Sequence, residues 1–195
     1  MSSSNKRQSV LPKVPSGPKA PVNFGSHVTI ADSAILTGSH TINISSESVI
    51  HPRARLESTY GRITIGRRCI VHERTHVGAP SSDDKRGDFG VLTEDYVVVE
   101  VGSIIESGNT TIGEGCHIGP RVTIGKGAKL GKHCTITAKS IIQPGEVVPD
   151  YTVVYSNGLR RTDKRGLEIL KAKAQARQIE ILRRLISSNP AKFKD

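Results

Sequence analysis

The chain has 195 residues, enough for one sizeable domain with appendages, and it contains only three Phe, four Tyr and no Trp. A core must therefore be built from branched aliphatic side chains. The three cysteines are far apart without a CxxC pair, which argues against a disulfide framework. The N-terminus has no apolar run and no stretch is long enough to span a bilayer, so we expect a cytosolic protein without direct membrane insertion.

The formal net charge of +10 is concentrated at the two ends of the chain. Residues 1–24 hold four basic and no acidic residues, and residues 156–195 hold eleven basic and four acidic residues. A nucleic-acid reader more often carries its basic face on the folded body, together with aromatic side chains. We therefore expect solvated basic tails, with an acidic protein partner as the alternative, and no binding of nucleic acid.

The first segment, residues 1–22, is rich in Ser, Pro, Lys and Gly, with four prolines spaced three residues apart. Such a composition buries too little apolar surface to order by itself. It predicts a disordered or docked extended N-terminal arm.

From Ile30 onward an aliphatic residue recurs every six positions, most strictly between Ile112 and Val154. In that strict run the first position of each unit is always aliphatic, and the fifth is small or β-branched in six of seven units. A period of six matches no single helical face, whereas a coil of three short strands and turns repeats about every 18 residues. Residues 23–155 are therefore predicted to form a parallel β-helix. We expect the glycine that often occupies the second position to serve close backbone approach or unusual φ angles.

Two segments depart from this rhythm. Residues 79–97 break it for about one coil, which predicts an inserted loop that is either functional or a tolerated insertion. Residues 156–195 are predicted to be a basic connector followed by a helix. Within that helix an apolar stripe either packs along the β-helix or is offered to a partner. The stripe consists of Leu167, Leu170, Ala174, Ile181 and Leu185.

Enzymatic β-helices of this type use histidine, as a general base in homotrimeric acyltransferases or as zinc ligands in γ-class carbonic anhydrases. His72 or His117 could act as a base toward an acyl acceptor. When the sequence is laid on the carbonic anhydrase pattern through Ile65 and Gly66, the three ligand positions fall at Gly78, Val101 and Glu106, none of which is His. We therefore expect no catalytic residues, no metal and no cofactor, although acyl transfer and zinc-dependent hydration stay open as alternatives.

Several motifs resemble the hexapeptide-repeat subunits of the dynactin pointed-end complex. The resemblance covers about residues 22–195 and comprises SVIHPRARLE, ITIGRRCIVHE, the long loop before VVVEVGSIIES, the strict units and then VVPDYTVVYSNGLRR. The last motif ends in Leu159, Arg160 and Arg161, an exit that favours one of the two β-helical subunits over its sister.

This resemblance implies a left-handed β-helix and a non-catalytic structural role. It implies a hetero-oligomer with the sister β-helical subunit and other pointed-end subunits, including an actin-related protein. Such a subunit belongs to the cytoplasm and cytoskeleton and supports dynein-driven microtubule transport and engagement of cargo or adaptors. The open strand edges at the ends of the rod, together with its flat faces, would suit stacking on a partner. The expected interaction residues are Arg160, Arg161, Leu170, Ile181 and Leu185.

Overall fold

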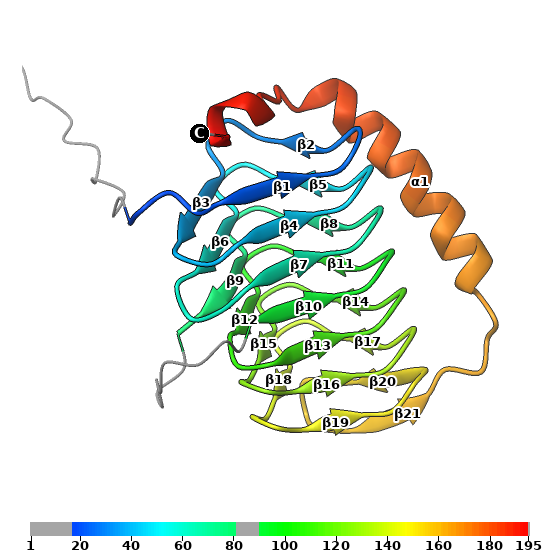
Figure 1. The fold of residues 1–195 in the computed structure, drawn as a ribbon. Helices are drawn as coiled ribbons and strands as arrows, with labels where there is room; N and C mark the ends of the chain where they lie inside the picture. Colours follow the sequence, from blue (N-terminus) through cyan, green and yellow to red (C-terminus); the bar gives the residue numbers. More distant parts are fainter. Residues whose placement is uncertain (1–16, 81–89, 195) are drawn as a thin grey trace, which may run out of the picture.

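The computed structural model describes residues 17–80 and 90–194 of the chain. The short strands wind into a left-handed parallel β-helix, and one long helix lies along its outside (Figure 1). The predicted fold class is confirmed. Most of the predicted N-terminal arm, residues 1–16, lies outside the described residues.

Within the described ranges the strands form three sheets, which we number in the order in which the chain first enters them. Sheet 1 consists of β1 (Val22–Phe24), β4 (Ile42–Ile44), β7 (Ile63–Ile65), β10 (Val91–Thr93), β13 (Thr110–Ile112), β16 (Lys129–Leu130) and β19 (Val147–Val148). Sheet 2 consists of β2 (Thr29–Ile30), β5 (Val49–Ile50), β8 (Ile70–Val71), β11 (Val98–Val99), β14 (His117–Ile118), β17 (Thr135–Ile136), β20 (Thr152–Val154) and β21 (Arg160–Thr162). Sheet 3 consists of β3 (Ile35–Gly38), β6 (Arg55–Ser58), β9 (His76–Ala79), β12 (Ile104–Glu106), β15 (Thr123–Ile124) and β18 (Ile141–Ile142).

The core is a set of stacked columns of branched aliphatic side chains. Each strand places the first residue of its six-residue unit inward, and parallel pairing puts equivalent residues of neighbouring coils in register. Burial of these side chains is the main favourable term in the stability of the rod. In sheet 2 the column contains Ile30, Ile50, Val71, Val99, Ile118, Ile136 and Val154, all of them buried.

At the corners, close backbone approach and positive φ occur at different positions of the unit, although we expected glycine at the second position to serve either. At the second position glycine allows close approach, since a Cβ added to Gly113 would lie 2.6 Å from the carbonyl carbon of Gly131. Positive φ falls instead at the fourth position, even where the residue is not glycine, as at His133 (φ 55°) and Lys139 (φ 60°). These residues carry the left-handed turn at a cost of roughly 1–2 kcal/mol each.

The insertion is shorter than the predicted 79–97. Strand β10 lies inside that range and pairs in register with β7 and β13. The rhythm failed to indicate this strand because Thr93 takes the inward position that is aliphatic in the strict run. Thr93 is buried, and its Oγ1 donates to the carbonyl oxygen of Thr64 at 3.4 Å.

Both ends of the rod are closed in part by the chain itself. At the N-terminal end Lys19 bridges to Thr37 of β3, Ser188 bridges to Ala31, and Phe193 packs against the core. At the other end β21 pairs antiparallel with β20. This pairing covers the edge of β20 and makes β21 the outermost strand of sheet 2, so stacking of an end on a partner stays a prediction.

The segment after the last coil contains more secondary structure than the predicted connector and helix. It contains β21, then helix α1 (Glu168–Leu185) and the 3₁₀ helix η1 (Pro190–Phe193). Helix α1 runs diagonally over sheet 2 and brings the C-terminal segment back to the first coil (Figure 1). None of the helices described here is long and apolar enough to cross a membrane.

Candidate functional site

The polar group most suited to chemistry lies on sheet 2, near helix α1. His51, His72 and Glu100 each follow the inward aliphatic residue of successive coils, so they form a column. The rings of His51 and His72 stack with centroids 4.5 Å apart. The Nε2 atoms of His72 and His117 lie 3.8 Å and 3.4 Å from the two carboxylate oxygens of Glu100.

A cavity of about 310 Å³ lies between Glu100 and His117 of this group and the N-terminal half of α1. Burial lowers the pKa of His117, which keeps its imidazole neutral and able to accept a proton. Glu100 and His117 therefore form a pair that could serve as a general base toward a small acceptor. The cavity is also lined by Tyr96, Val98, Thr135, Arg165, Lys171, Ala174, Gln175 and Gln178, among other residues.

The three positions expected from the carbonic anhydrase pattern are not brought together as ligands. Gly78 has no side chain and lies in β9 with φ +82°, and Val101 is exposed at a corner. Glu106 accepts a hydrogen bond at 3.0 Å from the backbone N–H of Lys126. Across the described ranges no group of three or more His, Cys, Asp or Glu side chains is placed to hold a metal ion. The column of His51, His72 and Glu100 on sheet 2 is therefore not placed to hold a metal ion either.

The cysteines are structural. Cys69 is buried and its thiol donates to the carbonyl oxygen of Glu94 at 3.1 Å. Burial raises the pKa of Cys69 to about 12, so its reactive thiolate is scarce at neutral pH. Cys116 and Cys134 are buried in the same column and likewise donate to backbone carbonyls.

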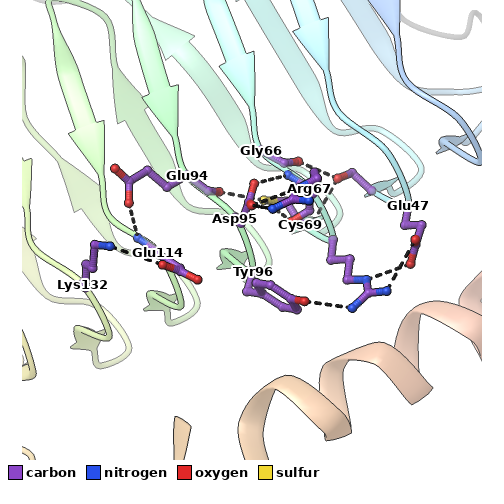
Figure 2. Close-up of polar contacts among 11 residues, drawn as sticks. Glu47, Gly66, Arg67, Cys69, Glu94, Asp95, Tyr96, Glu114 and Lys132 are labelled. Carbon is purple, nitrogen blue, oxygen red and sulfur yellow. Dashed lines mark hydrogen bonds and ion pairs between the residues drawn. The ribbon is translucent and has the colours of Figure 1, made fainter. Parts of the chain in front are cut away.

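A ladder of charged side chains follows the corner between sheets 1 and 2 (Figure 2). The guanidinium of Arg68 donates to Glu47 at 2.8 Å and to the hydroxyl of Tyr96 at 2.8 Å, and Arg67 pairs with Asp95. The hydrogen bond from Arg68 lowers the pKa of Glu47. These pairs are largely exposed, so each contributes little stability. The charged groups of these side chains find their hydrogen-bond partners within the ladder, which indicates a structural role in ordering the corner.

Helix α1 packs on the body through a face that we did not predict. Ile179 is buried against Val49 and Ile70, and Gln175 donates to the carbonyl oxygen of Arg68 at 2.7 Å. The interpretation in which the apolar stripe packs along the β-helix is therefore wrong. Its members Leu170, Ile181 and Leu185 are 63%, 58% and 75% exposed.

The two arginines of the exit motif have different environments. Arg160 forms an ion pair with Glu146, so it helps to hold β21 on the last coil. Arg161 is exposed and is the register partner of Val153. Of the two, Arg161 has the side chain more available to a partner.

Glu100 and Gln175 are the residues that sequence reasoning missed. Glu100 could have been found, because aligning the coils places His51, His72 and Glu100 at the same position of successive units. Gln175 gave no signal, since its burial depends on the angle at which α1 crosses the sheet.

Part of the repeat matches a known family model. Residues 109–144 match the family model described as bacterial transferase hexapeptide (six repeats). The fold is shared with a suggested acetyltransferase of Bacillus cereus, at 20% identity and a TM-score of 0.67 over 84% of this chain and 91% of that one. A hexapeptide transferase family protein of Anaplasma phagocytophilum has 16% identity and a TM-score of 0.57 over 85% and 97% of the two chains. At such identities these structures establish the fold alone.

The particular proteins that the chain resembles are dynactin subunits. It is 26% identical over 147 residues to dynactin subunit 6 of Nematostella vectensis, covering 72% of this chain and 77% of that protein. Dynactin subunit 6 of Danio rerio is 25% identical over 153 residues, covering 74% of each chain. The subunit of Xenopus tropicalis is 26% identical over 153 residues, covering 74% and 72%. The resemblance predicted from the motifs is confirmed.

Proposed function

We propose that this protein is a non-catalytic structural subunit of dynactin, located in the pointed-end complex. In this role it pairs with a sister β-helical subunit, contacts other subunits including an actin-related protein, and supports dynein-driven transport and engagement of cargo or adaptors in the cytoplasm. The observation that carries the proposal is the similarity to dynactin subunit 6 over about three quarters of the chain.

The structure supports a scaffold in physical terms. Parallel pairing along three sheets makes a stiff rod, because each coil is held by its neighbours. Helix α1 packs on sheet 2, to which β21 also belongs. Leu170, Ile181 and Leu185 of α1, together with Arg161, are exposed on that side of the rod and are our proposed contacts.

Affinity isolation of the tagged full-length protein from its native cells tests the proposal. We expect actin-related proteins and a second β-helical subunit to co-isolate in comparable molar amounts. Recovery of folded protein without either of them would contradict the assignment. Tagging each end of the chain in separate experiments guards against a tag that blocks a contact.

The cavity beside Glu100 and His117 supports acyl transfer as a second candidate. A neutral imidazole beside a carboxylate is the arrangement that a general base needs. Calorimetric titration with acetyl-CoA tests this candidate. Saturable binding, together with acetylation of an acceptor that is lost in His117→Asn, would favour the enzyme over the scaffold.

A further inference from the structure

The outer face of helix α1 carries an apolar stripe that the rest of the described chain leaves uncovered. We define the outer stripe as Leu170, Ile181 and Leu185, which are all exposed. Ala174 lies between them in sequence but lines the cavity that faces the body. Spacings of eleven and four residues, about three turns and one turn, place the three stripe residues on one side of a helix. The helix has 18 residues, so the stripe extends over about 20–25 Å.

Packing on the β-helix does not account for this stripe. The body contacts a different face of α1, formed by Gln175, Ile179 and Leu182. The helix thus has two faces with apolar residues, and only one of them is buried. Single exposed aliphatic residues are ordinary on protein surfaces, but an aligned set on one face of a helix is typical of a partner surface.

The charge beside the outer stripe indicates the chemistry of that partner. Lys173, Arg177 and Arg184 lie along one edge of the stripe, at spacings of four and seven residues. Arg184 is paired with Glu180 at 2.8 Å. Lys173 and Arg177 form no ion pair or hydrogen bond with any other residue that the structure describes, so two positive charges beside the stripe are unbalanced.

We propose that the outer stripe of α1 docks an amphipathic helix of another protein, whose own apolar stripe is flanked by acidic side chains. This inference rests on the proposed scaffold function and names the kind of partner that one lateral face takes. Aliphatic residues of the two helices would pack together, while carboxylates face Lys173 and Arg177.

The same observations disfavour two other occupants. A second copy of this chain would bring an identical basic edge, and like charges across an interface oppose association. A lipid surface calls for a broad apolar face with aromatic side chains, whereas this face is narrow and aliphatic. Both occupants are outcomes of the experiment below.

Site-specific photo-crosslinking in native cells tests the inference with the full-length protein. Benzoylphenylalanine replaces Ile181, and after irradiation the crosslinked peptide is identified by mass spectrometry. The expected product joins position 181 to a helical segment of another protein with acidic residues beside its apolar positions. Replacement of Ile169, which is 71% exposed but off the stripe, serves as the matched control and should not give this product.

Two sets of substitutions measure the contributions of the stripe and the charge. Leu170→Ser with Ile181→Ser and Leu185→Ser, and separately Lys173→Glu with Arg177→Glu, should each lower the yield of the partner by about tenfold or more. Ile169→Ser should leave the yield unchanged. Because all these side chains are exposed, circular dichroism should give the same melting curve for every variant.

The outcomes separate this inference from the proposed function. A crosslink to a second copy, to a segment that is not helical or to one without acidic residues overturns the inference, as does the absence of any crosslink. Binding of the wild type, but not the triple variant, to phosphatidylserine vesicles would assign the stripe to membranes and also overturn it. If actin-related proteins still co-isolate with the triple variant in full yield, the dynactin assignment stands while the stripe has no part in it.

Discussion

Three positions of the six-residue unit have distinct structural roles. The first position fills the core, the second allows backbones of adjacent coils to approach, and the fourth turns the chain through positive φ. The sequence predicted the first task directly, because aliphatic spacing is visible in the letters. It did not predict the fourth, because residues as different as Arg121, His133 and Tyr151 all occupy it.

The two tasks of glycine can be separated by substitution to alanine. Gly113→Ala places a methyl group against the backbone of Gly131 and should destabilise the protein by about 2–3 kcal/mol. Gly145→Ala meets no atom within 4 Å but keeps φ at 70°, and should cost only about 1 kcal/mol. Chemical denaturation of both variants measures the difference. Equal losses would contradict the assignment of separate roles.

Partly buried histidines should make the protein sensitive to mild acid. Burial lowers the pKa of His51, His76 and His117, so the unfolded chain takes up protons near pH 6.5 more readily than the folded chain. The free energy of unfolding should therefore fall as the pH drops from about 7 toward 5. His51→Asn should reduce the steepness of this fall in denaturation curves taken across that range. An unchanged steepness would show that His51 does not contribute.

At the scale of elements, the sequence located helix α1 but did not identify the face that packs on the body. The stripe through Leu170, Ile181 and Leu185 is the more regular apolar pattern, yet the body accepts the face with Gln175 and Ile179. A buried glutamine is compatible with packing here because the carbonyl of Arg68 accepts its hydrogen bond. Propensity and periodicity predict that a helix exists, but the crossing angle that selects its buried face depends on the assembled rod.

Separate truncation of Ile179 and Ile181 distinguishes the buried face of α1 from its exposed face. Ile179→Ala removes a side chain that is 3% exposed and should lower the free energy of unfolding by about 2–4 kcal/mol, or release the helix from the sheet. Ile181→Ala, on the exposed face, should change it by less than about 0.5 kcal/mol. Thermal and urea denaturation provide the measurement. A larger loss at Ile181 would contradict the docking described here.

Strand β21 should protect the last coil of sheet 2. Arg161 pairs with Val153 between the hydrogen-bonded pairs Tyr155–Leu159 and Tyr151–Asp163, which places it at a hydrogen-bonding position. Arg161→Pro removes its N–H and should cost about 1–3 kcal/mol locally. Faster hydrogen exchange in residues 152–154 is the expected result. Arg161→Ala keeps the backbone donor and should exchange as the wild type does.

At the scale of the whole molecule, the regular half of the rod was predictable and the irregular parts were not. Units from Ile112 to Val154 have the predicted register because every inward position is aliphatic. Strand β10 was missed where Thr93 replaces an aliphatic residue. Closure of the first coil by Ser188 depends on a hydrogen bond from Ile30, 158 residues away in sequence. Sequence periodicity carries local information, whereas the ends and the outer helix are fixed by long-range contacts.

The central claim is that this rod functions as one subunit among different subunits. Native mass spectrometry of the assembly isolated from cells tests it most directly, because it gives the copy number of every chain. We predict one copy of this chain in a large heteromeric assembly that contains actin-related proteins. A homotrimer of this chain without other subunits, the form used by hexapeptide acyltransferases, would contradict the account.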